Sequence, residues 1–258
     1  MKRFKILLLN TGYCVGVNGS RSQYVRYCYR YLFCSRRIQR QVIHDIDSLI
    51  AKENPDLCCF IELHKESNIL RRFNQLQALL DKEYRFYHMA NKYGERGILS
   101  RAPVFRQNTN GFMAKKELFF RRHYFRSGRK KLLYEIILEN DIHLFMAHFS
   151  LKKEVRERQF VQLKNLIQGK KRIIICGDFN IFHGYEELKP LLETGNLEVM
   201  NSSDQKTFPS CHPKRYFDLF ICSKDIKITN FKVLRHICVS DHLPVIMEFA
   251  VRKRVKHY

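Results

Sequence analysis

The sequence contains no tryptophan, and its nine cysteines include no CxxC pair. Without tryptophan, the chain has no tryptophan wedge or stacking platform for a bound base. An odd number of cysteines, with no close pair except the adjacent Cys58 and Cys59, predicts neither a disulfide framework nor a zinc site. Cys58, Cys59, Cys176 and Cys222 lie within apolar runs, where a free cysteine behaves as a small hydrophobe. The pattern indicates a reducing compartment.

Long apolar runs are also missing. The first one, Ile6 to Leu9, follows a basic start but ends at Asn10, whereas a signal peptide needs about seven or more apolar residues. No run approaches the roughly eighteen apolar residues of a membrane span. We therefore expect a soluble protein with a cytoplasmic location; export without a cleaved signal is the alternative.

Acidic residues are scarce, with 25 against 47 lysines and arginines, which gives a net charge of +22. Between Met1 and His44 there is no acidic residue at all. A charge this large implies an anionic partner: nucleic acid, an acidic membrane surface or phosphorylated small molecules. The alternative is a charge that only keeps the chain soluble.

The length and composition predict a single domain over residues 1–258. The chain is 45% hydrophobic, which is ordinary for a globular protein with a sizeable core, and no segment has the composition of a linker. Within this domain we expect a basic, aromatic-rich insertion at about residues 18–37 and a basic tail at 251–258. We expect a monomer.

Helices and strands are expected to alternate irregularly, with strands in excess. Helical spacing of apolar residues predicts helices over 36–51 and 152–167, a helical pattern through residues 69–80, and a short helix near 185–192. Apolar or alternating runs predict strands at 6–9, 57–61, 97–100, 118–125, 131–138, 142–149, 172–176, 216–222, 231–238 and 244–251. This arrangement favours an α/β sandwich over a regular doubly wound sheet.

Polar residues fall repeatedly where these apolar strands end. They are Asn10, Glu62, His148, Asp178 and Asn180. Strand ends are where rigid scaffolds commonly present chemical groups. A carboxylate such as Glu62, after five apolar residues, needs a partner or a cation. For His148 the alternative is a satisfied histidine of the core.

Two short motifs carry further candidate groups. In Asp178-Phe179-Asn180, the acid and the amide point the same way if the strand continues, and Gly177 lets the backbone turn or a ligand approach. A capping turn into a helix is the alternative interpretation. Asp241 and His242 precede the last strand and can serve a metal or phosphate jointly, or form an Asx-type turn.

Taken together and in this order, the motifs resemble those of the endonuclease/exonuclease/phosphatase superfamily. The resemblance covers residue 6 to about residue 250, so it is specific to the superfamily without identifying a branch. The segments that carry it are Leu8-Leu9-Asn10, Asn54-Pro55-Asp56 through Ile61-Glu62, Gly97 to Pro103, Ala147-His148, Gly177 to Asn180, Thr207-Phe208-Pro209, Tyr216 to Ile221 and Ser240 to Val245.

The resemblance implies a four-layered α/β sandwich, with two mixed β-sheets packed face to face and helices outside. It also implies a divalent metal ion, for which Glu62 is similar to the principal ligand, assisted by Asn10 and Asp241. A set of oxygen donors without cysteine selects Mg²⁺ or Mn²⁺ over zinc.

The same resemblance implies catalytic roles for five residues. Asp178 is similar to the group that orients or deprotonates the attacking water, and Asn180 to a group that hydrogen-bonds the phosphate. His242 would contact the phosphoryl oxygens, oriented by Asp218. His148 would stabilise the charge that develops on these oxygens.

One position departs from the pattern of many nucleases in the superfamily. They carry an acidic residue two positions after the asparagine that matches Asn10, and here that position is Gly12. The departure leaves a second metal contact at this strand in doubt and disfavours the abasic-site branch.

The segment between residues 21 and 37 bears on the substrate. Its arginines are interleaved with Tyr24, Tyr27, Tyr29, Tyr31 and Phe33. Such a pattern can track a phosphate backbone and stack on bases, or lie on an anionic bilayer, or form a helix with an aromatic core face.

We expect a Mg²⁺-dependent nuclease acting on DNA or RNA, with nucleic acid as its partner. The alternative is a phosphodiesterase or phosphatase for lipid or inositol phosphates at an anionic membrane. A third possibility, a binding protein that has lost turnover, is disfavoured because all eight expected site residues are present.

Overall fold

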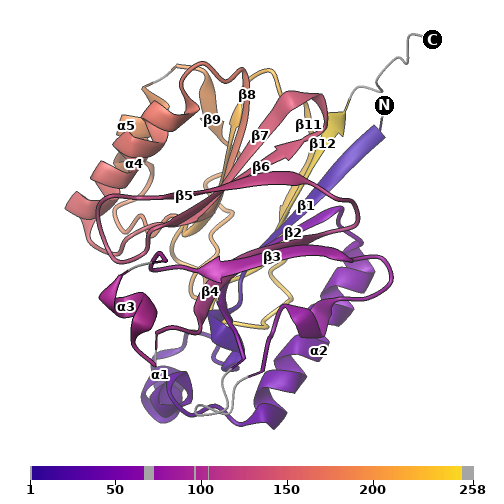
Figure 1. Cartoon of the computed structure of the whole chain (residues 1–258), viewed down its shortest axis with the longest axis vertical. Coiled ribbons are helices and arrows are strands. Elements are labelled where there is room, and N and C mark those ends of the chain that lie inside the picture. The colour runs from indigo at the N-terminus through magenta and orange to yellow at the C-terminus, as the bar shows by residue number, and fades with distance from the viewer. Residues whose placement is uncertain (1, 67–72, 96, 104, 194, 252–258) are drawn as a thin grey trace.

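Two six-stranded mixed sheets face each other in the computed structural model, which describes residues 2–66, 73–95, 97–103, 105–193 and 195–251 (Figure 1). In the first sheet, β1 is parallel to β2 and antiparallel to β12. Its order is β11 (Ile228–Val233), β12 (Val245–Val251), β1 (Lys2–Asn10), β2 (Leu57–His64), β4 (Asn108–Ala114) and β3 (Phe86–Asn91).

The second sheet is built in a similar way, with β7 parallel to β8 and β8 antiparallel to β10. Its order is β5 (Phe119–Tyr124), β6 (Leu132–Leu138), β7 (Ile142–His148), β8 (Arg172–Asp178), β10 (Asp218–Ser223) and β9 (Leu197–Val199).

The apolar runs form strands because both of their faces are buried. In β1, Ile6 and Leu8 enter the core between the two sheets, whereas Leu7 and Leu9 enter a second core under α2 (Arg36–Glu53). A third core lies under α4 (Lys153–Ile167), on the outer face of the second sheet. Figure 1 shows α2 on one side of the sheets and α4 on the other. The predicted sandwich of two mixed sheets is confirmed.

The remaining helical elements are short and lie in the connections. They are η1 (Gly12–Cys14), α1 (Arg21–Tyr27), η2 (Cys28–Tyr31), η3 (Gln77–Leu79), α3 (Ile98–Arg101), η4 (Glu139–Asp141), η5 (Tyr185–Leu188) and α5 (Lys189–Leu192). Among the described residues, no helix combines the length and the apolar content needed to cross a bilayer.

Three predicted elements differ from the structure. The strand predicted over 231–238 is shifted, because β11 spans Ile228–Val233 and residues 234–238 form no strand. The strand predicted over 97–100 is wrong, because these residues form the short helix α3. Of the helical pattern through 69–80, residues 67–72 lie outside the described part of the chain, and the described remainder contains the single 3-10 turn η3. Strands β3 and β4 were not predicted, since β4 contains the buried polar residues Thr109 and Asn110, which mask its strand pattern.

The strand directions bring the predicted site residues to one end of both sheets, which we call the site end. Asn10 and His148 are the last residues of β1 and β7. Asp178 ends β8 and lies opposite Asp218, the first residue of the antiparallel strand β10. Because β12 is antiparallel to β1, Asp241 and His242, which precede it, reach the same end.

Gly177 fixes how closely β7 and β8 approach each other. Its φ is +144°, and a Cβ added there would lie 1.8 Å from the carbonyl oxygen of Ala147. The neighbour that requires glycine is therefore backbone of the adjacent strand, not a ligand or a turn.

Away from the site end, β6 carries a buried carboxylate with three basic partners. Glu135 Oε2 lies 2.7 Å from His123 Nε2, and its Oε1 lies 2.8 Å from His143 Nδ1 and 2.9 Å from Lys170 Nζ. Burial alone would raise the pKa of Glu135, but Lys170 and the two histidines outweigh it and hold the pKa at about 2.

We expect Glu135→Gln to lower the free energy of unfolding by about 2 kcal/mol at pH 7, because it leaves the basic partners without their anion. A depressed carboxyl pKa contributes stability above the ordinary value of 4.5, and this contribution disappears as pH falls towards 2. Urea unfolding at pH 7 and pH 3 measures the difference between wild type and variant. An equal loss at both pH values would contradict this assignment.

Candidate active site

One oxygen atom, Oδ2 of Asp178, lies at the centre of the candidate site. Asn10 Nδ2 donates a hydrogen bond to it at 3.0 Å. His148 Nε2 lies 3.1 Å from it, and His242 Nε2 lies 4.0 Å from it. These side chains come from β1, β7, β8 and the loop before β12, so folding alone brings them together.

His242 is held by a buried carboxylate. Its Nδ1 lies 2.7 Å from Asp218 Oδ2, and its backbone N–H donates to Ser240 Oγ at 3.1 Å. The Phe208 ring packs against the imidazole at a centroid distance of 4.9 Å. Burial lowers the pKa of His242, but the carboxylates of Asp218 and its acidic neighbours outweigh it and raise the pKa to about 10. At neutral pH this side chain is therefore an imidazolium, with Nε2 directed towards Asp178.

Asn180 stands directly behind Asp178. Its backbone N–H donates to Asp178 Oδ1 at 3.1 Å, and its side-chain Nδ2 donates to the Phe149 carbonyl at 3.1 Å. Its φ of +52° lies in the left-handed region, which few residues other than glycine adopt without strain. Strand β8 ends at Asp178, so the strand does not continue through Asn180, and the turn caps no helix, since the next helical element of the described chain, η5, begins at Tyr185. The turn instead orients the Asp178 carboxylate.

Glu62 is turned towards the site by an irregularity in β2. The pairing of β2 with β4 shifts register between Phe60 and Leu63, and Glu62 itself has a φ of +61°. Bulges of this kind commonly redirect a side chain next to an active site. The backbone N–H of Glu62 donates to Asn110 Oδ1 at 3.1 Å, which holds the bulge in place.

Two lysines that the sequence analysis did not single out also reach the site. Lys92, after β3, places Nζ 2.8 Å from Glu62 Oε1 and also donates to the Tyr13 hydroxyl. Lys130, in the loop between β5 and β6, contacts His148 Nε2. Lys130 belongs to a basic stretch, but no sequence signal separates Lys92 from other lysines.

These cations set the protonation of the residues beside them. Burial opposes ionisation of Glu62, but Lys92, His148 and Lys130 outweigh it and hold its pKa at about 2. Burial together with the Lys130 charge lowers the pKa of His148 to about 4. At neutral pH, Glu62 is therefore ionised and His148 is neutral.

Asp241 faces the site without a lysine or arginine partner among its hydrogen bonds in the described structure. The hydroxyl of Tyr24, in α1, donates to its Oδ2 at 2.5 Å. Burial raises the pKa of Asp241, and the charge of Glu62 raises it further. A second carboxylate and a buried position both make a cation favourable here.

The departure at Gly12 has a structural reason. Its φ is +52°, and a Cβ at this position would lie 2.8 Å from Asp241 Oδ1. An acidic side chain at residue 12 would therefore be strained and would meet the Asp241 carboxylate. Asp241 occupies the space that such a residue would need.

The oxygen donors suit some metal ions better than others. Within the described residues, no group of three or more His, Cys, Asp or Glu side chains is arranged to enclose a metal ion. This does not fit a structural zinc site, which is closed by four protein ligands. Mg²⁺, in contrast, commonly uses one or two carboxylates and completes its shell with water and substrate oxygens. Glu62 and Asp241, with the amide of Asn10 nearby, fit that pattern.

The structure thus brings together all eight residues that the sequence predicts. Asp178 contacts Asn10 and His148, and His148 Nδ1 lies 3.7 Å from Glu62 Oε1. His242 lies beside the same Asp178 carboxylate, and Asp218 pairs with His242. Asn180 binds Asp178 through its backbone N–H, and Asp241 directly precedes His242 in the chain. The roles of Lys92, Lys130 and Tyr13, and the contact between Tyr24 and Asp241, were not predicted from the sequence.

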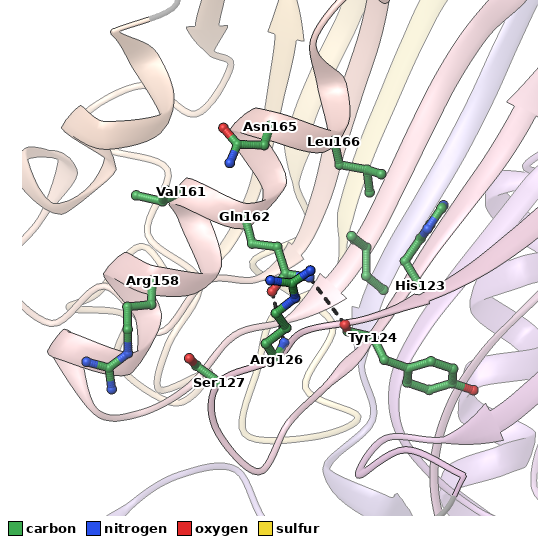
Figure 2. Close-up of a pocket in the computed structure, with 10 residues that line it drawn as sticks. His123, Tyr124, Arg126, Ser127, Arg158, Val161, Gln162, Asn165 and Leu166 are labelled. Carbon is green, nitrogen blue, oxygen red and sulfur yellow. Dashed lines mark hydrogen bonds between the residues drawn. The ribbon is translucent and has the colours of Figure 1, made fainter.

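A separate pocket of about 670 Å³ lies between β5 and α4. Figure 2 shows Arg126, Arg158 and Gln162 among the side chains around it. The backbone N–H of Arg126 donates to Gln162 Oε1 at 2.9 Å, which ties the loop after β5 to α4. None of the eight predicted site residues lines this pocket, so it is distinct from the candidate site.

Comparisons with known proteins concern both sequence and fold. Residues 37–242 match a family model described as the Endonuclease/Exonuclease/phosphatase family. No curated protein sequence matches the chain. Similar solved structures include an endonuclease/exonuclease/phosphatase family protein from Bacteroides thetaiotaomicron, with a TM-score of 0.68, 13% identity, and 100% of this chain and 98% of that chain covered.

Two further structures carry names that state an activity. A mannosyl-6-phosphatase from Bacteroides thetaiotaomicron gives a TM-score of 0.66 at 13% identity, with 96% of this chain and 100% of that chain covered. The endonuclease domain of TRAS1, a telomere-specific non-LTR retrotransposon, gives a TM-score of 0.61 at 14% identity, with 98% of this chain and 100% of that chain covered. At such identities the likeness concerns the fold.

Proposed function

Because this chain belongs to the endonuclease/exonuclease/phosphatase family, whose members hydrolyse phosphoester bonds, we propose that it is a phosphoester hydrolase that depends on a divalent metal ion. The observation that carries the proposal is the convergence of Asn10, His148 and His242 on the Asp178 carboxylate. Such a cluster can hold a water on one side and phosphoryl oxygens on the other.

Glu62, Asp241 and Asn10 would hold the metal ion, which we propose to be Mg²⁺ or Mn²⁺. When bound, such an ion neutralises a phosphate oxygen and stabilises the leaving oxygen. Lys92 already supplies a positive charge at Glu62, so the carboxylate stays ionised and available as a ligand at neutral pH.

Asp178 orients the attacking water in this proposal and accepts its proton. Its position is fixed by the side chain of Asn10 and the backbone of Asn180, at 3.0 Å and 3.1 Å. The nearby histidines and Lys130 outweigh burial and hold the pKa of Asp178 well below its usual range, so the carboxylate is ionised before substrate arrives.

His242 binds the phosphoryl oxygens as an imidazolium, and Asp218 keeps it protonated and in place. His148 is neutral and contributes a hydrogen bond in place of a charge. Asn180 contributes an amide beside the same oxygens. Preorganised donors of this kind stabilise the charge that develops as the phosphorus–oxygen bond breaks.

Nucleic acid is the first candidate substrate, cleaved at its phosphodiester bonds. The net charge of +22 supports it, because a long polyanion gains affinity from many cations spread over the surface. The TRAS1 endonuclease domain shows that the same fold serves a protein named as a nuclease.

A phosphorylated lipid or inositol is the second candidate. One observation of the structure favours it: Tyr24, Tyr27 and Tyr31 pack against the protein and do not form an outward stacking platform.

A substrate panel tests the proposed function. Single- and double-stranded DNA, RNA, phosphoinositides, soluble inositol phosphates and a soluble aryl phosphodiester are incubated with the protein and Mg²⁺, and Asp178→Asn serves as the blank. We expect product from at least one substrate with the wild type and far less with the variant. Binding without metal-dependent product from any substrate would instead indicate a protein that retains the fold without turnover.

A further inference from the structure

The segment that begins with α1 has two different faces. On the inner face, Tyr24, Tyr27 and Tyr31 pack on a small apolar cluster of Tyr13, Val15 and Val17. The guanidinium of Arg30 lies 3.7 Å from the centre of the Tyr27 ring and donates to the carbonyl of Val15 at 3.3 Å. The inner face therefore fastens the segment to the loop that follows β1, beside Asp241.

The outer face carries apolar side chains with little protein contact. Val25 is 80% exposed and Phe33 is 68% exposed, and Tyr29 and Leu32 are about half exposed. Val25 lies in α1 and Tyr29 in η2, and Leu32 and Phe33 follow η2 directly. All residues of α1 and η2 are described, and none is buried. Such exposure is unfavourable in water unless another surface covers it.

Three more exposed apolar residues lie in other loops at the site end. Leu151 lies three residues after His148, the last residue of β7, and Phe182 lies two residues after Asn180. Phe105 precedes β4, whose first residue pairs with the last residue of β2. Together with the four residues of the α1 segment, these form what we call the apolar rim, namely Val25, Tyr29, Leu32, Phe33, Phe105, Leu151 and Phe182.

Positive charge surrounds the apolar rim. Arg21, Arg26, Arg37 and Arg40 are exposed around the α1 segment, where the sequence has no acidic residue before Asp45. Arg126, Arg129 and Lys152 are exposed in the loops beside His148. Apolar side chains among arginines and lysines match a surface that is negative outside and apolar inside.

We propose that the site end docks on an anionic lipid bilayer, with the apolar rim inserted at headgroup depth and the arginines against the headgroups. This inference rests on the proposed function and deepens it, because it makes a phosphorylated lipid headgroup the substrate class. The predicted site residues lie at the same end of the two sheets as the rim, so docking would bring them towards the headgroups.

Nucleic acid fits the same surface less well. Stacking requires flat aromatic faces, and Val25, Leu32 and Leu151 are aliphatic. Of the four tyrosines that alternate with the arginines, Tyr24, Tyr27 and Tyr31 are directed into the protein, and Tyr29 is exposed. A bilayer interface, in contrast, accepts aliphatic and aromatic side chains alike.

Vesicle co-sedimentation tests the docking surface without any need for turnover. The full chain is mixed in EDTA with vesicles of phosphatidylcholine, with and without phosphatidylserine. We expect binding to the phosphatidylserine vesicles and a loss of about 10²- to 10⁴-fold in partition for Leu32→Ser/Phe33→Ser, because each of the two buried apolar side chains contributes about 10- to 100-fold. Val25→Asp provides an independent variant should the double variant fail to fold.

Phe119→Ser is the matched control. Phe119 is 62% exposed, but it begins β5 at the opposite end of the sheet from His148. We expect this variant to bind vesicles like the wild type, and Asp178→Asn to do the same. The rim variants should also retain hydrolysis of a soluble phosphodiester.

Three outcomes would overturn the docking proposal. In the first, the wild type does not bind phosphatidylserine vesicles. In the second, the rim variants bind these vesicles as tightly as the wild type. In the third, the rim variants lose affinity for a labelled oligonucleotide while their vesicle binding persists. The last outcome would identify the rim as a nucleic-acid surface. None of the three bears on hydrolysis itself, which the soluble phosphodiester measures separately.

Discussion

Asp178→Asn is expected to lower the turnover number by about 10²- to 10⁴-fold, the range typical for loss of a positioned acid or base. The substitution keeps the shape of the side chain but removes the negative charge that accepts the proton of water. It also places an amide against Asn10 Nδ2 and His148 Nε2, which now surround a carboxylate oxygen. Steady-state kinetics on the substrate found by the panel measure the loss.

The control for this prediction is Asp225→Asn, which changes an aspartate that pairs with Arg172 on the surface. We expect it to retain wild-type turnover, and both variants to retain the circular dichroism spectrum and a cooperative urea transition. Near-wild-type turnover of Asp178→Asn would show that Asp178 is not the group that handles water.

Lys92→Met should destabilise the protein by about 3 kcal/mol, because it removes the cation beside a largely buried carboxylate. In a chain of this size, each kcal/mol corresponds to roughly 2–4 °C in the melting temperature. If Glu62 is a metal ligand, a divalent ion can replace the missing lysine charge. We therefore expect Mg²⁺ or Mn²⁺ to raise the melting temperature of Lys92→Met more than that of the wild type.

The double variant Lys92→Met/Glu62→Gln isolates this interaction. Without a charge at residue 62, the loss of Lys92 should cost less, and divalent ions should no longer raise the melting temperature selectively. Thermal unfolding followed by circular dichroism, with and without metal, is measured for the wild type, the two single variants and the double variant, which together form a double-mutant cycle. If metal leaves Lys92→Met unchanged, Glu62 does not bind the ion.

The sheets and main helices were predictable because their patterns are strong. Apolar runs buried on both faces, such as Ile6 to Leu9, can only be central strands of a covered sheet, and the helical spacing of α2 leaves few alternatives. Part of the site followed from the same logic, whereas Asp218 and the individual catalytic roles followed only from the resemblance to the superfamily. Polar residues that end several buried strands meet wherever those strands share an edge, and Asn10, His148 and Asp178 do.

The misses have physical reasons of their own. The residues of α3 form one helical turn, too short to show helical periodicity, and their apolar residues instead suggested a strand. Lys92 and Lys130 gain their positions from the loops in which they lie, so their charge in the sequence does not distinguish them from the other basic residues. The sequence left open whether the aromatic side chains of the α1 segment stack on bases, lie on a bilayer or enter the core, because only the packing on Tyr13, Val15 and Val17 shows that Tyr24, Tyr27 and Tyr31 face inward.

The central claim is that the site-end cluster hydrolyses phosphoesters with a divalent ion held at Glu62. The most direct measurement is the rate of soluble phosphodiester hydrolysis in EDTA and after Mg²⁺ or Mn²⁺ is added back in increasing amounts, for wild type and Glu62→Gln. We predict no turnover in EDTA, a saturable recovery in the wild type, and a much weaker metal response in Glu62→Gln. Wild-type turnover that persists in EDTA, or a variant that responds to metal like the wild type, would contradict the account.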